Sequence, residues 1–308
     1  MPQPATPAEP LLLSVAIGQC GPQPWERSGG GHRLVEWLRP ALAESPVDLV
    51  VLSELATTPF FSVSTDRSWL TGGEALDGEQ VAAVGRLAAE LGAHVLLPFA
   101  ERDPRSGVLY NSVALLGPDG EPVAGSLCSG PHAGEEVFTY RKVHLSENRN
   151  VSPGVHEKYF FKAGDGFVVF DTPFGRLAPL VCYDRSFPES WRTVRAAGAR
   201  LVAVATATSR PERVALLQRE LSVAAVHNGV FVLSACKAGE ESAGPNGESV
   251  CYSGGSAVVS PFGEATAEAS AARGAEVLRC HIDLGTFDDY DRTYHFFRDR
   301  RPDTYASG

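Results

Sequence analysis

The sequence has no excess of basic residues: 27 Lys and Arg stand against 37 Asp and Glu among 308 residues. The formal net charge is −10. Nucleic acids and anionic membrane surfaces attract basic patches, so this balance argues against both as partners. A hydrophobic content of 44% with 21% charged residues is typical of a soluble globular protein with a sizeable core.

The six cysteines lack any pairing or metal-binding motif. No CxxC pair, no His/Cys cluster with zinc spacing and no HExxH occurs in the sequence. Scattered cysteines of this kind are typical of a reduced protein. The sequence therefore predicts a cytoplasmic location, and it gives no reason to expect a metal or another cofactor.

Long hydrophobic runs are also missing. No apolar stretch approaches the ~18 residues of a membrane span. The first ten residues, MPQPATPAEP, carry no basic residue ahead of the apolar run that follows, so a secretory signal is not indicated. We predict a flexible tail over 1–10 and a single domain over 11–308, because neither a linker nor a repeat interrupts the chain.

The chain does contain short apolar runs rich in β-branched residues, which are typical of buried strands. Ten such runs are predicted as strands: 11–19, 48–54, 94–100, 111–116, 166–171, 176–182, 200–206, 229–235, 255–260 and 276–283. Apolar residues at spacings of three and four predict helices over 74–92, 188–199 and 211–229. This alternation predicts an α/β protein with helix-covered sheets, and ten strands suffice for two packed sheets.

The segment 127–165 breaks this pattern. It is polar, rich in glycine and without clear periodicity. Loops of that length in a compact domain are usually functional or disordered.

Cys182 ends the apolar run RLAPLVC and is followed by Pro188, a residue suited to the first turn of a helix. A lone cysteine is often only a small buried hydrophobe. At the end of a strand, however, its thiol is open to chemistry, and N–H groups at the start of the helix would favour its thiolate. Cys182 is therefore a candidate nucleophile.

Two acids and a lysine could complete such a site. Glu54 ends the apolar run DLVVLS, where a buried carboxylate needs a partner. Lys142 lies in a β-like segment, where it shares a face with His144 if the segment is extended. Glu157 precedes a Tyr-Phe-Phe cluster. Each could equally be a surface residue, but together they offer a base, an ammonium and a thiol.

Other catalytic signatures are missing. Neither GxSxG nor GxxxxGK[ST] occurs, which argues against a serine hydrolase and a phosphate-binding loop. Eight histidines leave a Cys-His hydrolase open in principle, but no local pattern supports one.

Three segments resemble the signatures of the nitrilase (carbon–nitrogen hydrolase) superfamily. DLVVLSELATTPFF resembles the segment with the general base, YRKVHL the lysine segment, and GRLAPLVCYDRSFPE the cysteine segment. The three occur in the family's order. NSVALLGPDGEPV and SGGSAVVSPFGEATAEA resemble its recurrent strand-turn segments, so the resemblance extends over nearly the whole chain.

The resemblance implies a fold and a set of roles. The fold is a four-layer α-β-β-α sandwich of two mixed β-sheets. The roles are a general base for Glu54, an oxyanion-stabilising ammonium for Lys142, a nucleophile for Cys182, and for Glu157 a second carboxylate that holds the lysine. The resemblance also implies a homodimer or higher homo-oligomer, paired through helices near the cysteine.

Within the superfamily, CYDRSFPESWR and HEKYFFKAGDGFVVFDTPFG look most like the N-carbamoyl amino acid amidohydrolases, including D-carbamoylases and β-ureidopropionases. Arg185 matches an arginine that grips the substrate carboxylate there, a task suited to its planar fork. His144 matches a histidine near the substrate, and Tyr183 offers a backbone N–H to the oxyanion. Two positions depart from the D-carbamoylases: Ser186 stands where they have a second arginine, and Tyr183 stands where they have an asparagine. Whether the substrate carries a carboxylate, and which stereoisomer it is, therefore stays open.

The expected function is hydrolysis of a non-peptide C–N bond by a cysteine nucleophile. The carbamoyl group of an N-carbamoyl amino acid would leave through a thioester, giving amine, carbon dioxide and ammonia. The partner is thus a small amide or ureido substrate, with no cofactor or metal. One alternative is an amidase that acts on a neutral or cationic amide, and a covered or acid-paired Arg185 would favour it. Another is acyl transfer to an acceptor other than water. Nitrile hydrolysis fits the residues around Cys182 less well, and a non-catalytic binding protein on the same fold is a remote alternative.

Overall fold

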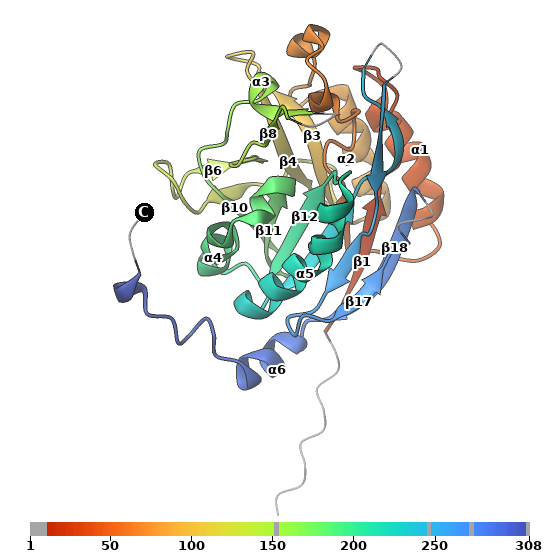
Figure 1. Ribbon diagram of the computed structural model, residues 1–308. Coiled ribbons are helices and arrows are strands. Elements are labelled where there is room, and N and C mark those ends of the chain that lie inside the picture. The colour runs from red at the N-terminus through yellow and green to blue at the C-terminus, as the bar shows by residue number, and fades with distance from the viewer. Residues whose placement is uncertain (1–10, 151–153, 245–247, 271–273, 306–308) are drawn as a thin grey trace, which may run out of the picture.

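Two mixed β-sheets lie face to face in the middle of the molecule (Figure 1). The computed structural model describes residues 11–150, 154–244, 248–270 and 274–305. The first sheet has the order β18 (Glu276–Asp283), β1 (Leu12–Gln19), β2 (Leu49–Leu52), β3 (His94–Arg102), β4 (Leu109–Leu116) and β7 (Thr139–Arg141). The second has the order β17 (Ala265–Glu268), β16 (Ala257–Val259), β13 (Phe231–Cys236), β12 (Leu201–Thr206), β11 (Gly175–Val181), β10 (Val168–Thr172), β5 (Gly125–Leu127) and β6 (Glu136–Val137).

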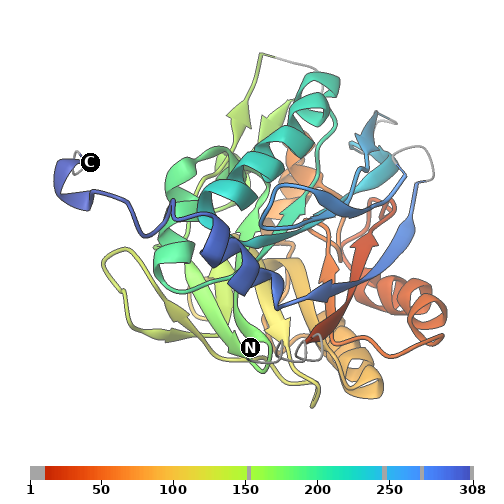
Figure 2. The same ribbon diagram turned by 90° about the horizontal axis from the view of Figure 1, so that it is seen from below.

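Helices cover the outer face of each sheet, as the two views show (Figures 1 and 2). On the first sheet, α1 (Gly30–Leu42) and α2 (Glu79–Leu91) bury their apolar faces against β2 and β3. On the second, α4 (Pro188–Ala196) and α5 (Pro211–Asn228) pack on the other side of the sandwich. The layers therefore run α-β-β-α, which confirms the predicted fold class.

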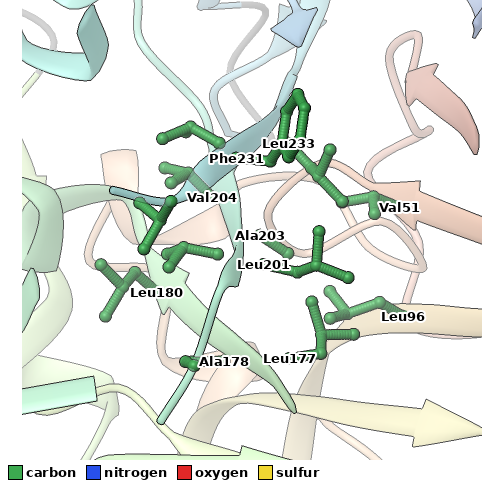
Figure 3. Close-up of a cluster of buried hydrophobic side chains, with 14 of the residues drawn as sticks. Val51, Leu96, Leu177, Ala178, Leu180, Leu201, Ala203, Val204, Phe231 and Leu233 are labelled. Atoms are coloured by element: carbon green, nitrogen blue, oxygen red, sulfur yellow. The ribbon is translucent and has the colours of Figure 1, made fainter. Parts of the chain in front are cut away.

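The core between the sheets is made of aliphatic side chains. Val51 and Leu96 of the first sheet face Leu177, Leu201 and Leu233 of the second (Figure 3). All residues of β12 are buried, because one of its faces packs on the opposite sheet and the other on helices. This explains why the central strands read as continuous apolar runs rather than as alternating patterns.

Each of the ten predicted strands and three predicted helices coincides with an element of the structure. The sequence patterns predict neither α1 nor α6 (Thr286–Thr293). The reason is clear in α1, which starts with Gly30 and Gly31 and contains Pro40, all poor helix formers. Packing of its apolar face on the first sheet stabilises this helix.

The segment 127–165 is only partly irregular. Its short elements, too brief for a periodic pattern, are the end of β5, β6, β7, β8 (Glu147–Asn148), β9 (Val155–His156) and α3 (Glu157–Phe160). The remaining elements of the structure are β14 (Ala238–Ser242), β15 (Ser249–Ser253) and the 3-10 helices η1 (Phe61–Val63), η2 (Arg67–Thr71), η3 (Cys182–Ser186) and η5 (Pro302–Thr304).

The described C-terminal segment passes beside α4 and α5. Beyond α6, the ring of Phe297 lies against the guanidinium groups of Arg192 and Arg195 of α4, and the segment follows the outside of the helical layer (Figures 1 and 2). The predicted tail over 1–10 lies outside the described residues, and the division into a tail and one domain stays a prediction. Within the described ranges, no helix has both the length and the apolar character to cross a membrane.

Candidate active site

The candidate nucleophile and the candidate base each follow the carboxyl end of a parallel strand. Cys182 comes directly after β11, and Glu54 comes two residues after β2. Cys182 has a φ of 46° and Leu55, next to Glu54, a φ of 50°; these are the non-glycine residues with positive φ in the described chain. Such conformations cost roughly 1–3 kcal/mol each and gather at functional sites. Backbone strain thus marks both predicted positions.

Lys142 joins two buried carboxylates. Its Nζ lies 2.9 Å from Oε1 of Glu54 and 2.6 Å from Oε1 of Glu157. Asn111 Nδ2 donates hydrogen bonds to the same two oxygens, at 2.8 and 3.2 Å. All four side chains are essentially inaccessible to solvent. The structure therefore brings together three of the four predicted catalytic residues in one hydrogen-bonded cluster.

The two carboxylates of this cluster differ in whether their second oxygen, Oε2, accepts a hydrogen bond. Oε2 of Glu157 accepts a hydrogen bond from the amide of Ser146 at 2.6 Å. Oε2 of Glu54 is buried and has no hydrogen-bond partner among the described residues. Glu54 is thus the carboxylate with an oxygen available to take a proton.

The charges of the cluster shift the pKa values of its members. Burial by itself lowers the pKa of Lys142, but the carboxylates of Glu157 and Glu54 outweigh it and raise that pKa, so the ammonium stays charged. Burial raises the pKa of Glu157, and the charge of Glu54 raises it further against the opposing effect of Lys142. The site thus holds a fixed ammonium within a low-dielectric environment.

The surroundings of Cys182 favour the protonated thiol. Burial and the nearby charge of Glu54 raise its pKa, against the opposing effects of Lys142 and Arg185. Desolvation and the neighbouring carboxylate thus oppose the thiolate that N–H groups at the helix start are expected to favour. A base is needed to remove the proton when the sulfur attacks.

Asp184 holds the turn that carries Cys182. Its buried carboxylate accepts hydrogen bonds from the amide of Val181 at 3.0 Å, the hydroxyl of Tyr140 at 2.6 Å and the amide of His144 at 2.9 Å. Nδ1 of His144 lies 2.9 Å from the same carboxylate, and its ring stacks on Phe187 with centroids 3.8 Å apart. His144 is thus bound to this turn, and it is not among the described residues that line the cavity at Cys182.

Arg185 is buried beneath the nucleophile. Its Nη1 donates to the carbonyl of Cys182 at 2.7 Å and to Oγ1 of Thr206 at 3.3 Å, and Thr206 in turn donates to Sγ of Cys182 at 3.3 Å. Its Nε forms an ion pair with Glu220 of α5 at 3.3 Å. Arg185 is thus already paired with an acid, and its grip on a substrate carboxylate stays a prediction.

A cavity of about 250 Å³ opens at the nucleophile. Cys182, Lys142 and Glu157 line it together with Tyr183 and Arg185. The amide of Tyr183 belongs to the first turn of η3, where N–H groups have no carbonyl partner within the turn. The volume suits a small molecule.

A larger cavity, of about 740 Å³, lies elsewhere, between α4, α5 and the C-terminal segment. Its lining includes Arg185 and Glu220, but not Cys182, Lys142 or Glu157. We therefore place the chemistry in the smaller cavity.

The residues around the smaller cavity offer nucleophilic rather than metal chemistry. Within the part of the chain that the structure describes, no group of three His, Cys, Asp or Glu side chains could hold a metal ion. A thiol, a carboxylate with a free oxygen and a fixed ammonium can together attack a carbonyl carbon and stabilise the resulting oxyanion.

Several residues of the site were not predicted from the sequence: Asn111, Asp184, Thr206, Glu220 and Tyr252. For Asn111 and Thr206 a signal exists, because each is a polar residue in a largely apolar strand and both are fully buried. Tyr252 and Glu220 carry no such local signal, since only the fold brings Tyr252 to the smaller cavity and Glu220 to Arg185.

Comparison with known proteins gives a consistent result. The carbon-nitrogen hydrolase family model matches residues 14–292. An N-carbamoylputrescine amidase of Arabidopsis thaliana is 31% identical over 236 residues, which are 73% of this chain and 71% of that protein. A nitrilase of Pyrococcus abyssi is 28% identical over 297 residues, 96% of this chain and 99% of that protein.

A solved structure shares the whole architecture. A carbon-nitrogen hydrolase from Helicobacter pylori G27 superimposes with a TM-score of 0.81 and 25% identity, covering 96% of this chain and 97% of that one. The predicted resemblance is confirmed: the chain belongs to the carbon-nitrogen hydrolase family of the nitrilase superfamily.

Proposed function

We propose that this chain hydrolyses a small amide or ureido compound through a thioester on Cys182. The observation that carries the proposal is the buried cluster of Lys142, Glu54 and Glu157, of which Lys142 and Glu157 line one cavity with Cys182. Burying charges is costly, and replacing such a cluster with apolar residues is often neutral or stabilising. A cluster retained next to a strained nucleophile is therefore better explained by catalysis than by stability.

The first half of the reaction forms the thioester. Sγ of Cys182 attacks the carbonyl carbon while Oε2 of Glu54 takes the thiol proton. The oxyanion is held by the ammonium of Lys142 and the backbone N–H of Tyr183. When the tetrahedral adduct collapses, Glu54 returns the proton to the departing nitrogen, so the C–N bond breaks and a C–S bond remains.

The second half releases the acyl group. Glu54 takes a proton from a water molecule that attacks the thioester carbonyl, and the same two donors hold the second oxyanion. The proton returns to the sulfur as the C–S bond breaks. Glu157 and Asn111 fix Lys142 and Glu54 throughout, which keeps the ammonium aimed at the oxyanion.

For the substrate we propose an N-carbamoyl amino acid, whose products would be the amine, carbon dioxide and ammonia. The carbamoyl group is supported by the name of the Arabidopsis relative, N-carbamoylputrescine amidase. A carboxylate is supported by Arg210, which lines the cavity, is about one-third exposed, and has Glu212 no closer than 3.6 Å. Arg210 is therefore a freer carboxylate receptor than Arg185, which Glu220 already pairs.

A second candidate is a cationic or neutral carbamoyl or amide compound. It is favoured by the pairing of Arg185 with Glu220, which neutralises the arginine expected to bind a carboxylate. The wall of the smaller cavity also carries an acid, Glu147. Its Oε1 lies 2.5 Å from Nε of Arg149 and 3.6 Å from Nδ1 of His156, so this acid is already paired as well. The acyl-transfer alternative remains a proposal without a structural observation in its favour.

One panel of substrates tests both candidates. Ammonia release is measured for N-carbamoyl-D- and L-amino acids, N-carbamoyl-β-alanine, N-carbamoylputrescine and simple neutral amides. We expect the carboxylated compounds to have the highest kcat/KM and Arg210→Leu to lower it far more for them than for N-carbamoylputrescine. A preference for N-carbamoylputrescine would establish the second candidate instead, and turnover of none of these compounds would contradict the proposed function.

A further inference from the structure

Tyr252 of β15 carries a buried hydroxyl without a partner. The residue is 2% exposed, and its hydroxyl forms no hydrogen bond with any of the described residues. Leaving a buried hydroxyl unpaired is unfavourable by about 1–3 kcal/mol. A group of this kind in a folded protein needs an explanation.

The ring of Tyr252 is held in place, so the hydroxyl cannot turn away to solvent. Its face lies 5.8 Å from Nζ of Lys237, measured to the ring centroid, and its edge meets Phe60 at a centroid distance of 6.1 Å. Lys237 is itself fixed by a buried ion pair with Glu241 at 2.7 Å. The hydroxyl therefore occupies one position.

The nearest buried acid does not need the hydroxyl. Oε1 of Glu241 accepts from the amide of Gln23 at 2.8 Å as well as from Lys237, and Oε2 accepts from the amide of Phe60 at 2.7 Å. Both oxygens of Glu241 are thus satisfied without Tyr252. Since no described residue serves as its partner, the hydroxyl is free to bind a molecule in the cavity.

The position of Tyr252 shows where that molecule would lie. Tyr252 lines the same small cavity as Cys182, Lys142 and Glu157. Burial, together with the charges of Glu241, Glu54 and Cys182, raises the pKa of Tyr252 well above its usual range. The hydroxyl is therefore a permanent hydrogen-bond donor on a residue that lines this cavity.

We propose that Tyr252 is a substrate-binding residue whose hydroxyl donates a hydrogen bond to an oxygen acceptor in the body of the substrate. The inference rests on the proposed function, and it adds a specificity element to it. The reacting carbonyl is served by Lys142 and the amide of Tyr183, so Tyr252 serves a different atom. Substrates with an oxygen beyond the reacting group are therefore bound more tightly than pure alkyl amides.

The test is Tyr252→Phe, which removes the hydroxyl and keeps the ring. We expect KM for the best substrate of the panel to rise about 10- to 100-fold, as for loss of a buried hydrogen bond, with a smaller change in kcat. For an alkyl amide without a second oxygen, KM should stay within about 3-fold of the wild-type value, a smaller change than the loss of one such hydrogen bond would cause. The thermal midpoint of the free protein should not fall, because the hydroxyl has no partner there.

The matched control is Tyr140→Phe, whose hydroxyl is bonded to Asp184 and whose loss should lower the thermal midpoint. Wild-type KM in Tyr252→Phe, or a fall in its thermal midpoint comparable to that of the control, would overturn the inference while leaving hydrolysis intact. Turnover of none of the panel by the wild-type protein would overturn both the inference and the proposed function.

Discussion

Around Cys182, single atoms determine what the site can do. Two carboxylates share one ammonium, and one carboxylate oxygen, Oε2 of Glu54, is left without a partner in the described structure. Burial and Glu54 favour the protonated thiol, because both raise its pKa. In the proposed mechanism, a neutral thiol beside a carboxylate with a free oxygen is the starting state for general base catalysis.

Removing the nucleophile should abolish turnover. We expect Cys182→Ala to lower kcat by about four orders of magnitude or more, since catalytic units of this kind act together. Cys280→Ala is the matched control, because Cys280 lies on β18, away from the cavity lining. Ammonia release measures both, and mass spectrometry of stopped wild-type reactions should show an acyl adduct on Cys182. Substantial turnover by Cys182→Ala would contradict the mechanism.

Neutralising the base should make the thiol more acidic. The negative charge of Glu54 raises the pKa of Cys182, so Glu54→Gln should lower that pKa and shift the midpoint of the pH-dependent alkylation rate to lower pH. Turnover should fall by about 10²- to 10⁴-fold in the same variant, because the proton acceptor is lost. Iodoacetamide alkylation followed by peptide mapping measures the first effect, with the surface variant Glu240→Gln as the control. An unchanged or raised midpoint would show that Glu54 does not face the thiol.

At the level of elements, strand ends and one tight turn position the chemistry. β2 and β11 bring Glu54 and Cys182 to their places, and the residues at these strand ends adopt positive φ angles. Asp184 compensates by binding the backbone of the strand end, the tyrosine of β7 and His144. The geometry of η3 thus depends on one buried carboxylate.

Removing this carboxylate should destabilise the fold. Asp184→Ala leaves several buried donors without an acceptor, so we expect the free energy of unfolding to fall by about 3–5 kcal/mol. Asp171→Ala is the control, because the exposed pair of Asp171 with Arg176 should contribute no more than about 1 kcal/mol. Urea denaturation of both variants measures the difference. Equal stabilities would mean that η3 does not depend on Asp184.

At the scale of the whole molecule, Arg185 connects two cavities. It contacts the nucleophile on one side, and with Glu220 it lines the larger cavity beside α4 and α5 on the other. Leu216 and Val223 of α5 are exposed apolar residues on this helix. The homodimer through helices near the cysteine stays a prediction, and this surface is where we expect it.

An acidic residue on this surface should separate the copies. We expect Val223→Glu to shift the protein from dimer to monomer in light scattering. The variant should also have a lower kcat/KM, because Glu220 and Arg185 line the same cavity as Val223. Phe138→Glu is the control, since Phe138 is an exposed aromatic residue in the loop between β6 and β7. Unchanged mass of Val223→Glu would place any interface elsewhere.

Local patterns in the sequence were enough for most of the fold. The ten apolar runs and three amphipathic segments all correspond to elements, because fully buried strands and helix faces leave a direct imprint on residue order. α1 shows the limit of this reasoning. Its glycines and Pro40 oppose helix formation locally, and only packing on the first sheet overrides them.

The family, the order of the three motif segments along the chain, and the candidate residues Glu54, Lys142, Glu157 and Cys182 were all readable from the residue order alone. Only the tertiary structure decided how they meet: Lys142 and Glu54 are 88 residues apart in the chain and 2.9 Å apart in space. The ion pair of Arg185 with Glu220 and the unpaired hydroxyl of Tyr252 likewise arise only in the folded chain. The partner of a polar side chain comes from a distant segment that meets it only on folding, so no local pattern can encode the pairing.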